Sequence, residues 1–279
     1  MSILSTEHLK IGYDEKIIVE DLSFTIQSGK ITTMIGPNGC GKSTILKALA
    51  RIHKAKSGCV YLDGKAIHKI PTKQIAQKMA VLPQSPEAPS GLTVFDLISY
   101  GRSPHQKGFA RLSDRDKEVI EWALKVTGLV ELRNQDVDTL SGGQRQRAWI
   151  AMAIAQETEL LLLDEPTTYL DMAHQLEVLK LLKKLNEDEN RTIVMVIHDL
   201  NHAARFSDRM VAMNNGRLMK EGTAEEVMTV GVLKDVFHID AMIVKDPRTN
   251  KPVCLSYDLV ELGKDIDNKN GIAQEIVFV

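Results

Sequence analysis

Nine consecutive residues carry the groups that would hold a triphosphate. The stretch from Gly36 to Thr44 reads G-P-N-G-C-G-K-S-T and fits the spacing G-x-x-x-x-G-K-S. Glycines in such a loop let backbone N–H groups approach phosphate oxygens, Lys42 brings a positive charge to the β- and γ-phosphates, and the Ser43 hydroxyl is a ligand for Mg²⁺. We therefore predict a nucleoside triphosphate site with Mg²⁺. Its predicted contacts are Gly36, Pro37, Asn38, Gly39, Cys40, Gly41, Lys42, Ser43 and Thr44.

Two acidic residues follow an apolar run. Leu160 to Leu163 is short and continuously apolar, as expected of a parallel strand that is covered on both faces. Ligands of open α/β sheets bind beyond the carboxyl ends of the strands, where Asp164 and Glu165 would emerge. Asp164 is suited to hold Mg²⁺, directly or through water, and Glu165 is suited to polarise an attacking water. The alternative is a salt-bridged pair of acids on the surface.

The elements that would position these groups begin with strands. Ile31 to Ile35 is a strand candidate that leads into the glycine-rich stretch, and the apolar spacing after the stretch is that of a helix. Asp21 to Gln27 alternates apolar and polar residues, which predicts a half-buried strand. Val60 to Gly64 and Met79 to Leu82 are further candidates. The first part of the chain is therefore predicted to be mixed β structure followed by α/β structure.

The middle of the chain has helical periodicity. From about residue 93 to 158 the apolar residues recur at helical spacing, and Ser113 with Asp116 fits a capping pair at the start of one helix. A second helical stretch lies between the Leu160 to Leu163 run and the apolar run Ile193 to Ile197. These elements predict a βαβ unit with a right-handed crossover.

The last part of the chain is the least informative. After Gly216 the sequence turns polar, and we expect it to be irregular. Beyond that point, Ala241 to Tyr257 could form a small strand pair. No motif is recognisable from about residue 241 onward.

Composition limits the class of protein. A chain of 279 residues that is 43% hydrophobic can bury a substantial core, and a net charge of −2 argues against a nucleic-acid binder. No apolar run approaches the roughly 18 residues that cross a bilayer, and the first residues lack the features of a secretory signal. Three scattered cysteines, Cys40, Cys59 and Cys254, do not suggest a disulfide framework or a zinc site. We therefore expect a protein of the cytoplasm.

One further string is specific to a family. Leu140 to Arg147 reads LSGGQRQR and resembles the signature of ABC-transporter ATPases. The resemblance continues at Pro166 to Asp171, which is similar to the D-loop, and at Val196 to Asp199, which is similar to the switch-histidine region. Gln84 matches the glutamine of the Q-loop, and Tyr13 matches the aromatic residue that stacks on adenine.

The resemblance implies a fold and a domain division. The fold is α/β, a P-loop NTPase core with a mostly parallel sheet, an N-terminal antiparallel β subdomain and a helical subdomain at about residues 90–158. The nucleotide-binding domain would span residues 1–240, and residues 241–279 would form a C-terminal accessory extension.

The resemblance also assigns roles around bound ATP and Mg²⁺. The implied catalytic residues are Glu165, His198, Gln84 and Lys42. The implied metal ligands are Ser43, Gln84 and Asp164. His198 and His202 could instead form an i, i+4 metal pair, although no further ligand is evident.

A single chain cannot place both its phosphate loop and its signature on one nucleotide. The resemblance implies a head-to-tail dimer in which ATP lies between the phosphate loop of one copy and the signature of the other. Asp171 would contact the partner subunit. The implied contacts of the signature with ATP are Ser141, Gly142, Gly143 and Gln144.

The chain has one phosphate loop, one signature and no span, so it would need a separate integral-membrane permease. Gly91 to Ile98, Tyr100 to Gln106 and Thr168 to Gln175 resemble bacterial import ATPases for iron(III)-siderophores of the ferrichrome and ferric citrate type. The subunit would then lie on the cytoplasmic face of the membrane and serve an extracytoplasmic substrate-binding protein indirectly. Import of haem, vitamin B12 or another metal, and a soluble ABC ATPase of the iron–sulfur assembly type, remain alternatives. Phe95 and its apolar neighbours would either meet the permease or belong to the core.

Overall fold

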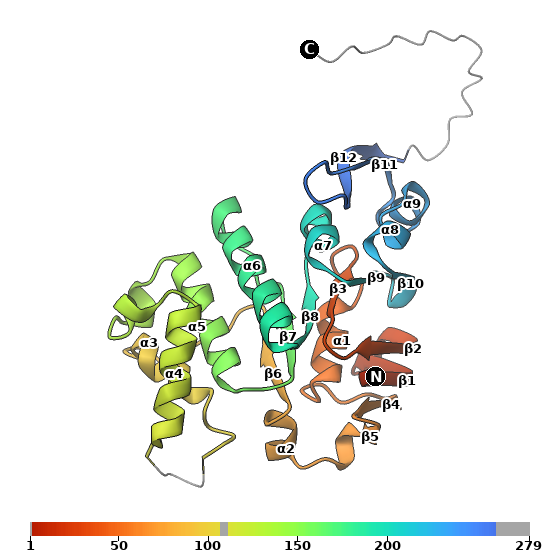
Figure 1. Ribbon diagram of the computed structural model, residues 1–279. Coiled ribbons are helices and arrows are strands. Elements are labelled where there is room, and N and C mark those ends of the chain that lie inside the picture. The colour runs from red at the N-terminus through yellow and green to blue at the C-terminus, as the bar shows by residue number, and fades with distance from the viewer. Residues whose placement is uncertain (1, 107–110, 261–279) are drawn as a thin grey trace, which may run out of the picture.

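The structure of the protein, a computed structural model, describes residues 2–106 and 111–260. Its centre is a six-stranded sheet in the order β10-β9-β3-β8-β7-β6, in which β10 is antiparallel to β9 and all other neighbours are parallel (Figure 1). The strands are β3 (Ile31–Ile35), β6 (Met79–Leu82), β7 (Leu160–Asp164), β8 (Thr192–Val196), β9 (Arg209–Asn214) and β10 (Arg217–Gly222). The predicted mostly parallel sheet is confirmed.

Three of the four inner strands of this sheet, β3, β8 and β7, are buried along their whole length. Each is a short run of apolar and β-branched residues, which suits a strand with both faces covered. Their register places both Ile31 and Leu161 beside Ile193. The predicted βαβ unit is confirmed as well, with α6 (Met172–Glu189) as its crossover helix.

A second, antiparallel sheet in the order β2-β1-β4-β5 forms the N-terminal part of the fold. Its strands are β1 (Ser2–Tyr13), β2 (Lys16–Gln27), β4 (Ser57–Leu62) and β5 (Lys65–Ala66). The predicted alternation in β2 is confirmed, since Leu22, Phe24 and Ile26 are buried while the residues between them are exposed. The buried face shares a core with α1 (Lys42–Leu49), the helix that follows the phosphate loop.

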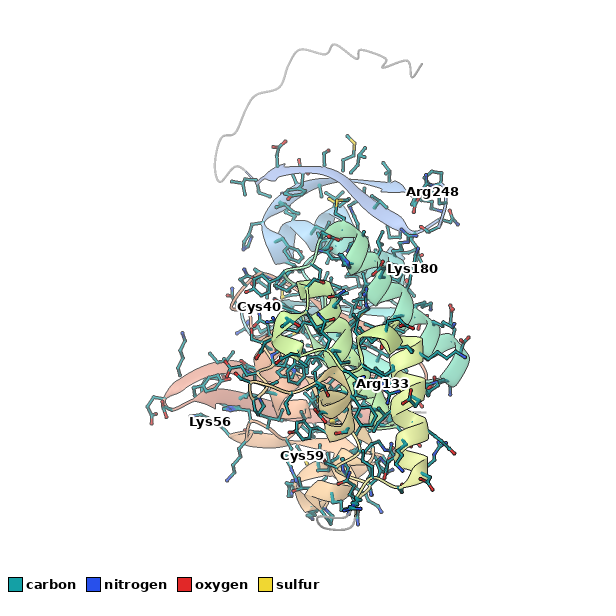
Figure 2. All side chains as sticks on the ribbon, turned by 90° about the vertical axis from the view of Figure 1, so that its left-hand side faces the viewer. Cys40, Lys56, Cys59, Arg133, Lys180 and Arg248 are labelled. Atoms are coloured by element: carbon teal, nitrogen blue, oxygen red, sulfur yellow. The ribbon has the colours of Figure 1, made fainter. Side chains whose placement is uncertain are left out.

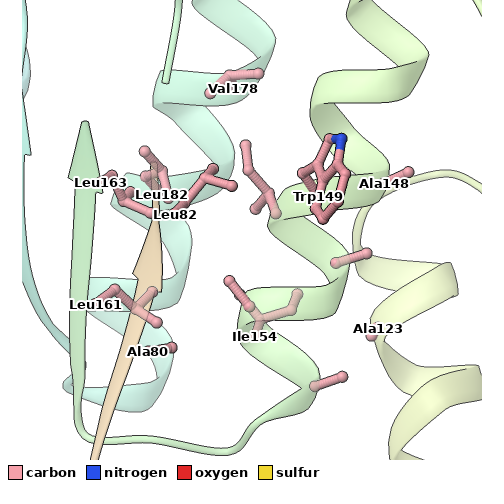
Figure 3. Close-up of a cluster of buried hydrophobic side chains, with 14 of the residues drawn as sticks. Ala80, Leu82, Ala123, Ala148, Trp149, Ile154, Leu161, Leu163, Val178 and Leu182 are labelled. Atoms are coloured by element: carbon pink, nitrogen blue, oxygen red, sulfur yellow. The ribbon is translucent and has the colours of Figure 1, made fainter. Parts of the chain in front are cut away.

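A helical part lies against the β6 side of the central sheet (Figure 1). Its helices are α3 (Val94–Tyr100), α4 (Asp114–Val126) and α5 (Gly142–Ala155), with 3₁₀ turns at Val130–Leu132 and Val137–Thr139. The short helix α2 (Thr72–Ala76) and the 3₁₀ turn Ile67–Lys69 instead share the core of the antiparallel sheet. The predicted capping pair is confirmed, because the Ser113 hydroxyl accepts the Asp116 N–H at 3.2 Å and the Asp116 carboxylate accepts the Ser113 N–H at 3.0 Å. Figure 3 shows Ile154 of α5 directed toward Leu161 of β7, within one buried cluster.

Burial decides which apolar side chains of α3 belong to the core and which could meet a permease. Leu97 and Ile98 are buried and belong to the core. Phe95 is partly buried, whereas Tyr100 is 49% exposed. Of the apolar side chains in this segment, only Phe95 and Tyr100 are therefore available to a partner.

The C-terminal part is regular, so the prediction of an irregular segment after Gly216 is wrong. The segment after Gly216 contains β10, α8 (Ala224–Val227), α9 (Val230–Phe237) and the hairpin of β11 (Ile239–Lys245) and β12 (Pro252–Leu259), and α7 (Leu200–Phe206) precedes it. The helices here are too short to produce a recognisable apolar period. The predicted strand pair is confirmed as β11 and β12. Residue 240, where the predicted nucleotide-binding domain ends, lies within β11, and residues 261–279 of the predicted extension lie outside the described residues.

Candidate active site

The phosphate loop connects the carboxyl end of β3 to the start of α1. Gly36 has φ of 152°, and a Cβ at this position would lie 2.2 Å from the carbonyl oxygen of Met213 on neighbouring β9. Gly41, the residue before α1, has φ of 106°. Only glycine adopts such backbone angles freely and fits so close to another main chain. The structure thus has the strand, loop and helix that the sequence predicts.

The loop folds around the side chain of Lys42. The Nζ atom donates hydrogen bonds to the carbonyl oxygens of Gly36 (2.8 Å) and Pro37 (2.9 Å), and it lies 3.7 Å from Cys40 Sγ. Lys42 is 5% exposed. The ammonium group is therefore held inside the loop, where a bound phosphate chain would meet it. Figure 2 shows Cys40 well apart from Cys59, and both are free thiols.

Ser43 and Asp164 come together at the carboxyl end of the sheet. The Ser43 hydroxyl donates to Asp164 Oδ1 at 2.8 Å. Burial raises the pKa of Asp164, the hydrogen bond from Ser43 opposes this effect, and the nearby charge of Glu165 adds to it. A hydroxyl and a buried carboxylate are oxygen donors of the kind that Mg²⁺ prefers. These two predicted metal ligands thus fit a magnesium ion.

Glu165 is held by three polar side chains. Its Oε1 lies 2.6 Å from His198 Nε2, and its Oε2 accepts hydrogen bonds from Gln84 Nε2 (2.7 Å) and Thr168 Oγ1 (2.9 Å). Burial alone would raise the pKa of Glu165, but the hydrogen bonds from His198 and Thr168 outweigh it, so the pKa lies below its ordinary value. The carboxylate is therefore charged at neutral pH.

The backbone at Glu165 is also unusual, with φ of 53°. Residues other than glycine adopt this left-handed conformation uncommonly, and here it forms a sharp turn directly after β7. The sharp turn directs the side chain of Glu165 toward the phosphate loop while Asp164 keeps its place at the end of β7.

His198 and His202, the alternative metal pair, contact different residues. His198 contacts Glu165, whereas His202 Nδ1 lies 3.9 Å from Asp199 Oδ1 at the start of α7. Among residues 2–106 and 111–260, no three His, Cys, Asp or Glu side chains gather closely enough to hold a metal ion.

A pocket of about 660 Å³ joins the phosphate loop to Glu165. Its lining consists of Lys16, Ile18, Asn38, Gly39, Gly41, Lys42, Ser43, Thr44, Gln84, Glu165, Thr168, Tyr169 and His198. The structure thus brings together the predicted loop, the predicted base and its predicted partners. Sequence reasoning missed Lys16, Ile18, Thr168 and Tyr169. A signal for Thr168 was present, since a hydroxyl three residues after an acid in a turn can bond back to it.

The remaining predicted residues do not line this pocket. Tyr13 is 45% exposed, and its ring lies 4.4 Å from the ring of His53, centroid to centroid. The signature begins α5 on the helical part, where Ser141 and Gln144 form a capping box. Asp171 caps α6, and hydrogen bonds from the backbone and side chain of His174 lower its pKa. The signature residues outside the pocket are Ser141, Gly142, Gly143 and Gln144.

Comparison with known proteins identifies the family. Residues 19–168 match the family model described as ABC transporter. The chain belongs to the ABC-transporter ATPases. It is accordingly an ATP-binding enzyme that hydrolyses ATP, and its α/β P-loop fold is that of the family.

Relatives and solved structures agree with this assignment. The chain is 65% identical over 266 residues to the iron(3+)-hydroxamate import ATP-binding protein FhuC of Bacillus subtilis (strain 168). This match covers 95% of the chain and 99% of the relative. It also matches a chain of an inward-facing metal-chelate type ABC transporter, with a TM-score of 0.79, 32% identity, and coverage of 91% and 98%. A dimeric bacterial ABC transporter cassette matches with a TM-score of 0.71, 28% identity, and coverage of 79% and 98%.

Proposed function

We propose that the chain is the ATP-hydrolysing subunit of an ABC importer that takes up an iron(III)-siderophore through a separate membrane permease. The observation that carries the hydrolytic role is the placement of Glu165, a charged carboxylate held beside the phosphate loop by His198 and its neighbours. The cargo is supported by the 65% identity with an iron(3+)-hydroxamate import ATP-binding protein, since the match extends over nearly the whole of both chains.

The loop from Gly36 to Thr44 would bind the phosphates of ATP. Lys42 would exchange its bonds with loop carbonyls for bonds to the β- and γ-phosphates. Mg²⁺, when bound, would neutralise phosphate charge and align the phosphates for attack. Its proposed ligands are Ser43, Asp164 and Gln84. The Gln84 amide now donates to Glu165, so the side chain would have to turn away from that carboxylate to reach the metal.

Hydrolysis would then need a base and a group that holds the γ-phosphate. We assign the base to Glu165, which would take the proton of the water whose oxygen attacks the γ-phosphorus. The bond between that phosphorus and the bridging oxygen breaks, and ADP leaves with the electron pair. His198 would orient Glu165 and contact the γ-phosphate, because it lies 2.6 Å from the carboxylate and lines the same pocket.

The second half of the site would come from another copy of the chain. The phosphate loop lines the pocket, but the signature does not. A head-to-tail dimer would place Ser141 to Gln144 of one copy on the ATP of the other. The N-terminus of α5 suits a phosphate because its N–H groups and helix dipole favour an anion. Asp171 would contact the partner, and Tyr13 would stack on adenine.

Transport would require further subunits. In the part of the chain that the structure describes, no helix combines the length and the apolarity needed to cross a bilayer. A permease would therefore bind this subunit at the cytoplasmic face of the membrane. An extracytoplasmic substrate-binding protein would deliver the siderophore to the permease without touching this chain.

The hydrolytic role is tested with Glu165→Gln. We expect this variant to bind ATP, to hydrolyse it at least about 100-fold more slowly, and to accumulate as a dimer in light scattering with ATP. Glu159→Gln is the matched control, because Glu159 is an exposed acid just before the opposite end of β7. If Glu165→Gln hydrolyses ATP at the normal rate, the base has been assigned to the wrong residue.

The cargo is tested by uptake in cells that lack this subunit. We expect loss of labelled ferric hydroxamate uptake, with haem, cobalamin and manganese uptake retained. Loss of haem uptake alone would overturn the cargo. Co-purification with a polytopic membrane protein separates the importer from a soluble ABC ATPase.

A further inference from the structure

The C-terminal hairpin is joined to the helix that follows His198 by one side-chain amide. Asn201 Nδ2 donates to the carbonyl oxygen of Cys254 at 3.1 Å, and the Cys254 N–H donates to Asn201 Oδ1 at 2.8 Å. Within the described residues β12 pairs with β11 alone, so the amide occupies the hydrogen-bonding position of a neighbouring strand at the other edge of β12. Because both ends of the amide are bonded, its orientation is fixed.

Apolar packing continues this contact. Ala203 and Ala204 of α7 lie in one buried cluster with Ala241 and Cys254 of the hairpin. The small side chains let α7 and the hairpin approach closely, as Figure 1 shows for the two elements. The same cluster contains Ile35, the last residue of β3 before the phosphate loop. The hairpin therefore shares a core with the end of β3, which leads into the phosphate loop, and with α7, which follows His198.

Helix α7 needs such support to hold its orientation. It has seven residues, and isolated helices shorter than about 12 residues are marginal in water. Asp199 caps its first turn by accepting the His202 N–H at 2.6 Å, and His198 directly precedes this cap. The His198 side chain is 42% exposed, so its position depends largely on the backbone that carries it.

We propose that Asn201 is a positioning residue for ATP hydrolysis. By fixing the first turn of α7 to β12, it holds the backbone of His198 where the imidazole reaches Glu165 and the γ-phosphate. This inference rests on the role proposed above for His198. The hairpin is then part of the support of the hydrolytic site.

The test compares two substitutions that each remove an amide. Asn201→Leu keeps the size of the side chain and removes both bonds to Cys254. Asn214→Leu is the matched control, because Asn214 Nδ2 donates to the carbonyl oxygen of Asp235 at 3.1 Å and so joins β9 to α9 without touching α7. We expect Asn201→Leu to lower kcat about tenfold or more while KM for ATP stays the same, since a misplaced catalytic group costs rate rather than binding. Asn214→Leu should lower the thermal midpoint similarly and keep kcat.

A double variant identifies the route of the effect. If Asn201 acts through His198, Asn201→Leu should lower kcat no further when His198→Ala is already present. Normal hydrolysis by His198→Ala would overturn the role proposed for His198. A defective His198→Ala together with equal kcat values for Asn201→Leu and Asn214→Leu would overturn this inference alone. If Asn201→Leu is too unstable to purify, Asn201→Ala gives the same comparison, because it removes the amide without adding apolar bulk.

Discussion

His174 lies directly against Gly143, and this contact joins the start of α6 to the start of α5. A Cβ on Gly143 would lie 2.7 Å from His174 Cδ2 and 2.9 Å from Cγ. The Nδ1 atom of the same ring lies 2.8 Å from Asp171 Oδ1, and Asp171 caps α6. One imidazole therefore links Asp171 to the signature helix, so the two groups proposed to face a partner subunit are held in a fixed relation within one chain.

This contact predicts opposite results at two adjacent glycines. Replacing a helical glycine by alanine usually stabilises a protein by about 0.5–1 kcal/mol. At Gly143 the new methyl group would displace His174 and weaken its bond to Asp171, at a cost of about 1–3 kcal/mol. We expect Gly143→Ala to lower the thermal midpoint and to weaken ATP-dependent dimerisation in the Glu165→Gln background.

Gly142 supplies the control for this prediction. A Cβ on Gly142 would meet only the carbonyl oxygen of Tyr169, at 3.9 Å. Gly142→Ala should therefore keep or raise the thermal midpoint. A similar rise for Gly143→Ala would mean that His174 does not restrict this position.

The buried ion pair of Arg102 and Asp116 is expected to stabilise the helical part. Arg102 is 3% exposed, and its Nε donates to Asp116 Oδ1 at 2.8 Å while its Nη1 donates to the carbonyl oxygen of Ala155 at 2.6 Å. Arg102→Leu would leave the Asp116 carboxylate buried without a cation, which costs about 3–5 kcal/mol. Urea unfolding measures this loss. Lys117→Leu is the control, because it removes an exposed pair with Asp114 that is worth at most about 1 kcal/mol. Equal losses would contradict the burial of the Arg102 pair.

The sequence predicts those parts of the site whose chemical groups come from residues that are adjacent in the chain. The phosphate loop is one, because its glycines and Lys42 act as one continuous segment. Asp164 and Glu165 are another, because the carboxyl end of a buried strand fixes their place. The relation between Gln84 and Glu165 is different. It depends on β6 and β7 being neighbours, and the sequence did not predict that the amide of Gln84 would bond to the acid.

Long-range contacts of single side chains could not be predicted. Asn201 and Cys254 are 53 positions apart, and neither residue belongs to a motif. Their contact follows from the short elements α8 and α9, which bring the chain back over α7. The apolar residues of these helices are too few to establish a period, and so the sequence alone predicts irregular structure there.

The exposed ring of Tyr13 predicts a contribution to nucleotide binding. Packing against His53 holds the ring, and the residue as a whole stays 45% exposed, so adenine can reach it. Stacking of a base on an aromatic side chain is worth about 1–3 kcal/mol, so Tyr13→Ala should weaken ATP binding by that amount in a titration, and Tyr13→Phe should not. Tyr257→Ala, at an exposed tyrosine of the C-terminal hairpin, is the control. Unchanged affinity in Tyr13→Ala would remove Tyr13 from the site.

The burial of Asp164 predicts how the stability of the nucleotide-free protein depends on pH. Burial raises the pKa of Asp164 above its unfolded value, so between these two values the folded state binds more protons than the unfolded state. The free energy of unfolding contributed by this group therefore falls as the pH rises through that interval. Asp164→Asn removes the charge and keeps an oxygen that accepts the Ser43 hydroxyl. We expect Asp164→Asn to raise the thermal midpoint at pH 7, with the difference vanishing as the pH falls below the unfolded pKa.

Asp171 provides a comparison of opposite sign. Hydrogen bonds from His174 lower its pKa, so Asp171 stabilises the fold above its unfolded pKa and loses this effect as the pH falls through its folded pKa. Asp171→Asn should therefore lower the thermal midpoint at pH 7. Adding Mg²⁺ and ATP should stabilise the wild type more than Asp164→Asn, because a ligand that binds only the folded state stabilises it by an amount that grows with the logarithm of its affinity. A lower midpoint for Asp164→Asn without nucleotide would mean that the surroundings of Asp164 favour its charged form. The carboxylate would then not need Mg²⁺ to offset its burial, which would weaken the case for a magnesium site here.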